Sequence, residues 1–169
     1  MRLLVYGGVV GTEVAPISGK EDLLEMTAPL PNSHPIAPTA LRLFFDTHGQ
    51  IRSLTTGDYL CWEGESADAF YRVEAGELEL QIFAGDLGFI TVSTLGPGDC
   101  LGWACLLPPY SWRLSARAAS PSVVVACDAD MLRTHCENNP RFGYEVSRFV
   151  LKLIASRIRA TRRKLLRTS

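Results

Sequence analysis

The sequence predicts a mainly β fold, an antiparallel jelly-roll barrel with short flanking helices and a long C-terminal helix. Three observations support this prediction. From Ile51 to Asp128, short apolar segments are separated by turns rich in Gly, Pro and Asp at close spacing. Apolar and polar residues alternate within several segments, which is typical of strands with one buried and one solvated face. No helical crossover separates the segments, so a parallel sheet is excluded.

The central region is expected to consist of short strands. Alternation is clear at 112–118, where the apolar positions face away from Arg113, Ser115 and Arg117. Residues 100–109 are too apolar for an exposed loop, so we expect one buried helical turn there. The predicted strands span 51–54, 59–62, 69–74, 77–83, 89–95, 112–118 and 122–128.

The chain divides into three predicted segments. Residues 1–37 form an irregular N-terminal extension, because glycines interrupt its first apolar stretch and prolines follow. Residues 38–140 form the β-roll, with a short helix at 38–46 before the strands and another at 129–137 after them. Residues 141–169 form an amphipathic basic helix, since this stretch lacks Pro and has a helical apolar period.

Composition and charge narrow the possible functions. The 169 residues are 47% hydrophobic, which suits one globular domain and excludes a disordered chain. No apolar run approaches the roughly 20 residues that a membrane-spanning helix needs, so no transmembrane segment is expected. Residues 1–147 carry a net charge of −9, whereas residues 148–169 carry +8. Such a basic end suits nucleic acid, an acidic membrane or an acidic patch of a partner, or is simply a solvated helix face.

Cysteine and histidine usage argues against an enzyme. The five cysteines form no CxxC and most lie in apolar segments, which indicates buried free thiols in a reducing, cytoplasmic compartment. The three histidines are scattered, so they do not supply the clustered ligands of a metal centre or of a metal-dependent jelly-roll enzyme. No Ser-His-Asp or Cys-His arrangement is evident. We therefore expect no catalytic residue, no metal and no resident cofactor.

Several segments together resemble one known family. The matching residues are 57–60, 63–68, 69–73 with Gly76, 95–99 with Leu101 and Gly102, 117–118, and the closing helices. On these residues the chain resembles the cyclic nucleotide-binding domain family, the jelly-roll effector domain of catabolite-activator-type regulators and kinase regulatory subunits. The resemblance covers roughly residues 40–165. It implies a cyclic-nucleotide-binding-like roll that serves as a regulatory or ligand-sensing module.

The resemblance also implies a ligand site, from which this chain departs. In the family, a Glu beside the glycine at the Gly102 position holds the ribose hydroxyl, and an Arg further along neutralises the cyclic phosphate. Trp103 and Trp112 occupy those two positions here. The candidate cassette implied by the resemblance is Gly102, Trp103, Ala104, Cys105, Trp112, Arg113, Ser115 and Arg117.

Two interpretations of this cassette are open. In the first, the two indole rings fill the pocket. The domain is then a scaffold without a ligand, or it binds a flat apolar effector that stacks on the rings. In the second, Arg113 or Arg117 takes over the phosphate, and the effector is cyclic AMP or cyclic GMP. The first interpretation is favoured, because loss of the charged partner of a desolvated phosphate costs several kcal/mol.

The C-terminal helix has a broader apolar arc than packing on one roll needs. In the family the corresponding helix pairs with its twin, so we expect a homodimer, with a protein partner as the other possible contact. The alternative is a helix buried on its own roll. The predicted dimer face is Phe142, Val146, Phe149, Val150, Leu153, Ile154 and Ile158.

The opposite side of that helix is basic. Its predicted residues are Arg148, Lys152, Arg159 and Arg163. The family's transcription factors carry a helix-turn-helix after this helix, whereas this chain stops at Ser169. Sequence-specific DNA binding by that route is therefore not expected, although the basic end can still bind phosphates in a salt-dependent way.

Overall fold

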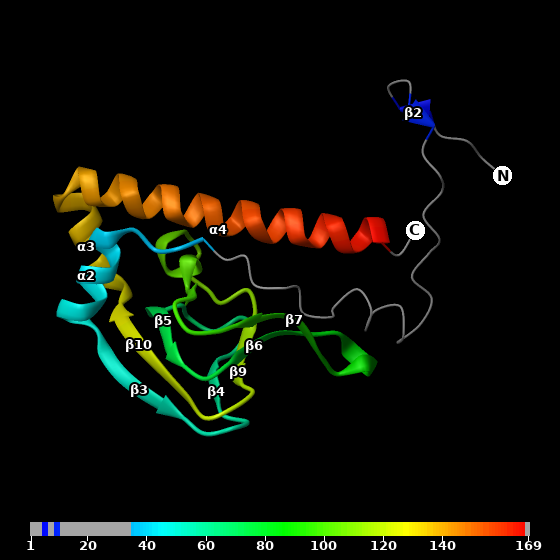
Figure 1. Cartoon of the computed structure of the whole chain (residues 1–169), viewed down its shortest axis with the longest axis horizontal. Coiled ribbons are helices and arrows are strands. Elements are labelled where there is room, and N and C mark those ends of the chain that lie inside the picture. Colours follow the sequence, from blue (N-terminus) through cyan, green and yellow to red (C-terminus); the bar gives the residue numbers. More distant parts are fainter. Residues whose placement is uncertain (1–4, 7–8, 11–34, 168–169) are drawn as a thin grey trace.

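Two antiparallel sheets of four strands each form the body of the molecule (Figure 1). The computed structural model describes residues 5–6, 9–10 and 35–167, with side chains described for 35–159. The strands are β3 (Gln50–Leu54), β4 (Tyr59–Cys61), β5 (Ala69–Ala75), β6 (Leu78–Phe83), β7 (Phe89–Leu95), β8 (Cys100–Leu101), β9 (Ser115–Ala118) and β10 (Ser122–Asp128). One sheet has the order β3-β10-β5-β8 and the other the order β4-β9-β6-β7.

The predicted jelly-roll fold is confirmed, with two local corrections. The strand expected at 112–118 begins only at Ser115, because the backbone of Trp112 instead bonds to the turn after β4, donating to the Glu65 carbonyl and accepting from the Gly64 N–H, both at 2.8 Å. A further strand, β8, occupies Cys100–Leu101, where only a helical turn was expected. It is two residues long, which is too short to produce a periodic signal.

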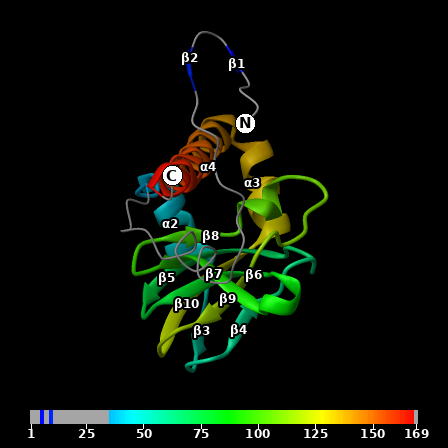
Figure 2. The same cartoon turned by 90° about the vertical axis from the view of Figure 1, so that its right-hand side faces the viewer.

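Three helices flank the roll in the described part of the chain: α2 (Thr39–His48), α3 (Ala129–Asn138) and α4 (Pro140–Arg167). Their bounds agree with the predicted helices to within two residues. Asp128 caps α3, because its carboxylate accepts the Met131 N–H at 2.8 Å. Helix α4 lies across the top of the roll, over α2 and α3, and extends well beyond them (Figures 1 and 2).

The core runs continuously from the roll into the helices. Large side chains from β5 and β6 fill the space between the sheets, and residues of α2 and α4 join the same cluster. Its largest fully buried side chains include Leu41, Phe45, Phe70, Tyr71, Leu78, Leu95, Val146 and Leu153. The first half of α4 is therefore part of the domain's core.

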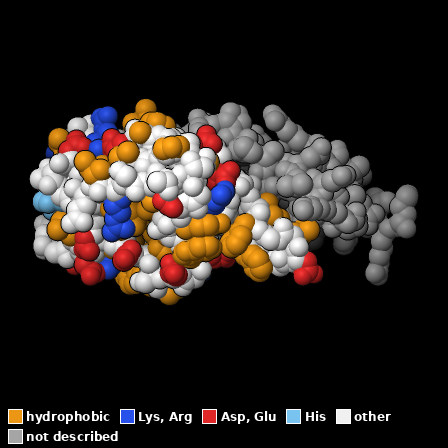
Figure 3. Space-filling view, turned by 90° about the horizontal axis from the view of Figure 1, so that it is seen from below, with side chains coloured by type: hydrophobic (Ala, Val, Ile, Leu, Met, Phe, Trp, Pro, Cys, Tyr) orange, Lys and Arg blue, Asp and Glu red, His pale blue; other side chains and the backbone are white. Residues whose placement is uncertain are grey.

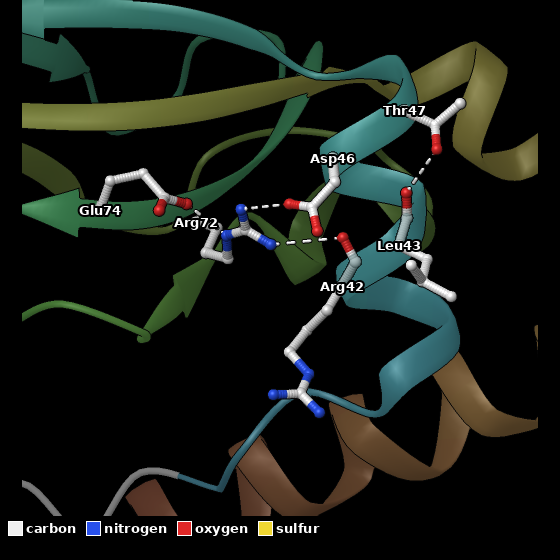
Figure 4. Close-up of polar contacts among 6 residues, drawn as sticks. All are labelled: Arg42, Leu43, Asp46, Thr47, Arg72 and Glu74. Atoms are coloured by element: carbon white, nitrogen blue, oxygen red, sulfur yellow. Dashed lines mark hydrogen bonds and ion pairs between the residues drawn. The ribbon is translucent and has the colours of Figure 1, made fainter.

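A partly buried arginine holds α2 against the roll (Figure 4). Arg72 of β5 donates to the Asp46 carboxylate of α2 at 2.7 Å and to the Arg42 carbonyl at 3.3 Å. It also pairs with Glu74 on its own strand. These contacts hold α2 against β5, the strand that also carries Tyr71.

The N-terminal extension is only partly described. Two short strands, β1 (Val5–Tyr6) and β2 (Val9–Val10), pair antiparallel, with Val5 opposite Val10. The expectation of irregular structure was wrong at these positions, because the preference of β-branched valine for strands prevails there. The other residues of the predicted extension up to position 34 lie outside the described residues.

Candidate ligand cavity

A small cavity lies between the second sheet, the segment after β8 and helix α4. Its volume is about 40 Å³. Five of the predicted cassette residues are on its wall. The lining consists of Cys61, Leu80, Leu101, Gly102, Trp103, Ala104, Trp112, Arg113, Leu114, Ala116 and Arg157.

The turn that begins at Gly102 forms one side of this cavity. Residues Trp103–Leu106 form the short 3₁₀ helix η2, which confirms the predicted buried helical turn. Gly102 has φ of +112°, and a Cβ there would lie 2.7 Å from the Ala69 carbonyl oxygen. Only glycine allows this backbone to approach β5 so closely. On the other side of the turn, Arg133 of α3 donates to the Cys105 carbonyl, which holds the turn in place.

Trp112 closes the cavity from the segment before β9. Its side chain is 7% exposed and its ring stacks on Tyr71 with the centroids 5.9 Å apart. The indole Cη2 lies 3.3 Å from the position that a Cβ on Gly102 would take. Trp112 thus fills the space between β5 and η2, and Trp103 packs against the same core.

Tyr71 supports this wall from β5. Arg52 donates to the Tyr71 hydroxyl at 3.3 Å, and its guanidinium lies 5.8 Å from the ring centroid. Burial raises the pKa of the Tyr71 hydroxyl, although the charge of Arg52 acts in the opposite direction. The tyrosine is therefore a neutral, anchored support for Trp112 and does not itself line the cavity.

Two arginines provide positive charge at the cavity. Arg113 is exposed and comes from the segment before β9. Arg157 comes from α4 and is largely buried; its burial lowers its pKa, and the charge of Asp99 acts in the opposite direction. Sequence reasoning missed Arg157. It follows the buried Leu153 by one helical turn, and this spacing was the available signal for its place on the roll-facing side.

The family model of the cyclic nucleotide-binding domain matches residues 51–139, which are more than half of the chain. The chain belongs to the cyclic nucleotide-binding domain family. Solved structures agree in fold. A protein from Geobacter metallireducens GS-15 is 25% identical with a TM-score of 0.60, over 82% of this chain and 96% of that one.

Other solved structures with this fold are more distant in sequence. A cyclic nucleotide-binding domain from Methylobacillus flagellatus KT is 20% identical with a TM-score of 0.68, over 88% of this chain and 83% of that one. The catabolite activator protein of Thermus thermophilus is 23% identical with a TM-score of 0.61, over 78% of this chain and 60% of that one. No curated protein sequence matches.

The remaining cassette positions of this cyclic nucleotide-binding domain are not on the cavity wall. Arg117 lies on the outer side of the second sheet, where it forms an ion pair with Glu79 at 3.7 Å. Ser115 is buried and its hydroxyl accepts the Glu63 N–H at 3.0 Å, so its expected place on a solvated face was wrong. Arg113 precedes β9, so strand alternation does not determine its direction, and it reaches the cavity instead. Cys105 is buried within η2.

Most of the predicted dimer face of the cyclic nucleotide-binding domain is already covered by the same chain. Phe142, Val146, Phe149, Val150 and Leu153 belong to the core cluster, and Ile154 packs against it. Ile158 is 63% exposed. On the basic face Arg148, Lys152 and Arg159 are exposed, whereas Arg163 lies outside the residues whose side chains are described.

A larger surface groove lies elsewhere, between α2, the end of α3 and the start of α4. Its volume is about 560 Å³, and its lining includes Phe44, His48, His135 and Phe142 but none of the cassette residues. The His135 ring meets Phe142 edge-on at 4.6 Å. Within the described ranges, no cluster of His, Cys, Asp and Glu is suited to a metal ion, and no helix is both long and apolar enough to cross a membrane.

Proposed function

We propose that this domain is a non-catalytic regulatory module whose phosphate cassette is degenerate, and that it acts through a dimer or a partner protein. The observation that carries the proposal is the cavity of about 40 Å³ with Trp103 and Trp112 on its wall. Pockets that hold drug-sized ligands are typically ~300–1,000 Å³, whereas this space has room for a few water molecules. The free cysteines support a reducing, cytoplasmic setting.

The decisive experiment measures thermal unfolding with millimolar cyclic AMP and cyclic GMP. The wild-type domain is expected to show no shift with either nucleotide. Binding at 100 times the dissociation constant would add ~2.7 kcal/mol, which is ~5–10 °C for a domain of this size. The double variant Trp103→Glu, Trp112→Arg restores the family's residue types and is the matched control. A shift in the wild-type domain overturns the degenerate cassette.

A second candidate function is a genuine nucleotide sensor. It is favoured by one observation: Arg113 and Arg157 both line the cavity, so positive charge is present although both family positions are tryptophan. If this function holds, nucleotide binding is lost in Arg113→Gln and is kept in Arg117→Gln, because Arg117 pairs with Glu79 away from the cavity. Equal binding by the two variants contradicts a role for Arg113.

Of the predicted dimer face only Ile158 is exposed, so a dimer through α4 would use Ile158 together with residues outside that face. Tyr144, Leu151 and Ile158 are exposed and lie seven residues apart, which places them on one side of the helix. We propose that this stripe contacts a second α4. Sedimentation equilibrium should show that the wild-type domain is a dimer. The Leu151→Asp variant should be a monomer, whereas the Lys152→Asp variant should remain a dimer. A monomeric wild-type domain, or equal dimer strength in both variants, contradicts the proposal.

Electrostatic binding through the basic face is a further candidate, supported by the exposure of Arg148, Lys152 and Arg159. Arg148 lies 5.7 Å from the Tyr144 ring centroid. Binding to single-stranded DNA or to anionic vesicles should weaken steeply with salt and fall in Lys152→Glu, Arg159→Glu. Binding that is indifferent to salt, or absent at low salt, excludes this candidate.

A further inference from the structure

Four aromatic side chains form a connected cluster on the second sheet and its hairpin. Tyr59 stacks on Trp62 with ring centroids 3.8 Å apart, and Trp62 contacts Phe89 at 5.8 Å. Phe89 in turn meets Phe83 at 5.4 Å across the β6–β7 pair. We call these four residues the aromatic platform. The cavity described above shares no residue with it.

The aromatic platform is open to solvent. Trp62 is 41%, Phe83 62% and Phe89 45% exposed. Figure 3 shows hydrophobic side chains gathered into a patch on the lower face of the molecule, with acidic side chains near it. Single exposed aromatics are ordinary, but a contiguous exposed patch with a polar rim is typical of an interaction site.

A polar network anchors Tyr59, the ring on which Trp62 stacks. Gln81 is 6% exposed, and its amide oxygen accepts the Tyr59 hydroxyl at 3.0 Å. The same amide donates to Glu79 at 3.1 Å and to the Thr91 hydroxyl at 3.5 Å. Tyr59, which is anchored in this way, loses little side-chain entropy when a partner binds.

The charge around the platform is negative. The segments that carry and flank the rings, 58–65 and 78–91, contain five acidic residues and no basic one. The neighbouring strand β9 contributes Arg117, but this side chain pairs with Glu79 at 3.7 Å. Like-charge repulsion therefore disfavours nucleic acid and anionic membranes here, whereas a basic partner is attracted.

We propose that the aromatic platform is the docking site for an arginine-bearing segment of a partner protein. A guanidinium group stacks on the exposed faces of Trp62 and Phe89, and the carboxylates at the rim neutralise the charge. Arginine suits this site better than lysine, because its planar group stacks on aromatic rings and is less strongly hydrated. The surface gives the proposed regulatory module a partner interface that does not depend on whether the cavity binds a nucleotide.

The test titrates the full chain with a labelled peptide in which arginine alternates with glycine and serine. Fluorescence anisotropy follows binding, and a peptide with lysine at the same positions is the comparison. The arginine peptide is expected to bind at least threefold more tightly than the lysine peptide. Phe83→Ala and Trp62→Ala should each weaken its binding at least fivefold, and Glu79→Gln should reduce the salt dependence.

The matched control is Leu43→Ala, which removes a similarly exposed apolar side chain from α2 and should leave peptide binding unchanged. Because Trp62 also stacks on Tyr59, the folding of each variant is first checked by thermal unfolding. Phe83 has fewer ring contacts, so the Phe83→Ala variant is used for the test if Trp62→Ala is unstable. Equal binding of both peptides, or arginine-peptide binding that survives Phe83→Ala, overturns the proposal. Preference for single-stranded DNA or anionic vesicles at the platform also overturns it. None of these results bears on the nucleotide experiment, since the platform and cavity share no residue.

Discussion

Trp112 stacks on Tyr71 with the ring centroids 5.9 Å apart, so the wall of the candidate cavity is also part of the domain's core. Tyr71 lies on β5, which pairs with β10 on one side and β8 on the other. Trp112, which closes the cavity, therefore also contributes to the stability of the roll. A change that opens the site is expected to weaken the fold.

Trp112→Ala should lower the free energy of unfolding by ~3–5 kcal/mol, because a buried indole is removed and a cavity remains. Urea denaturation measures the loss. Leu107→Ala, which changes a half-exposed side chain of the same segment, is the control and should cost no more than ~0.5 kcal/mol. Similar losses in the two variants would show that Trp112 does not hold the segment against β5.

Gly102→Ala should be more destabilising than Gly98→Ala. Both glycines have positive φ, at +112° and +89°, so both substitutions strain the backbone. At Gly102 the new Cβ also meets the Ala69 carbonyl oxygen at 2.7 Å, whereas nothing lies within 4 Å at Gly98. We expect ~1 kcal/mol at Gly98 and at least ~2 kcal/mol at Gly102 from thermal unfolding. Equal losses would contradict the close approach of η2 to β5.

Arg72→Met should destabilise the domain more than Asp46→Asn. The Arg72 side chain is 14% exposed and bonds to two carboxylates and a carbonyl, whereas that of Asp46 is 57% exposed. We expect ~1–3 kcal/mol for the arginine and ~0.5 kcal/mol for the aspartate, because the exposed Asn amide stays hydrated and its oxygen can still accept from Arg72. Chemical denaturation of both single variants and the double variant measures the coupling. If Asp46→Asn lowered the free energy of unfolding more than Arg72→Met, the prediction that Arg72 contributes more to this contact would be wrong.

Much of this architecture could be predicted from the chain. The alternation of apolar and polar residues in β6 and the turn residues between strands predicted the roll, because one face of each strand is buried and the other is solvated. The pairing of Trp103 and Trp112 in one cavity also followed from the resemblance, and the structure brings both to its wall. Local sequence patterns were sufficient to predict the structure where the environment of each residue is determined by its own strand.

The parts that escaped prediction depend on contacts between distant segments. Ser115 is buried, and its hydroxyl accepts the N–H of Glu63, a residue 52 positions earlier, which the alternation of polar and apolar residues does not reveal. Arg157 reaches the cavity because α4 crosses the roll at that height. Trp62 and Phe89 were not predicted to meet, since strand order in a jelly roll is not the order in the chain. Each of these positions is determined by tertiary structure.

The buried thiols should make the domain sensitive to alkali. Burial raises the pKa values of Cys61, Cys100 and Cys105 to about 12, whereas an unfolded cysteine ionises near ~8.5. Above the pKa of the unfolded cysteine, the unfolded chain releases thiol protons that the folded chain retains. The free energy of unfolding therefore falls as the pH rises. Each such thiol contributes a slope of about 1.4 kcal/mol per pH unit until its folded pKa is reached.

Urea denaturation at pH 7 and pH 10 of the wild-type domain and of Cys105→Ala isolates one of these thiols. The variant is less stable at neutral pH, because a buried side chain is shortened. It should nevertheless lose ~1–2 kcal/mol less than the wild-type domain between the two pH values, since one ionising group is absent from its unfolded state. Other groups that titrate in this range are common to both proteins and cancel in the difference. An identical loss in both proteins would mean that the Cys105 thiol ionises as readily in the folded domain as in the unfolded chain, which its position inside η2 beneath α3 does not allow.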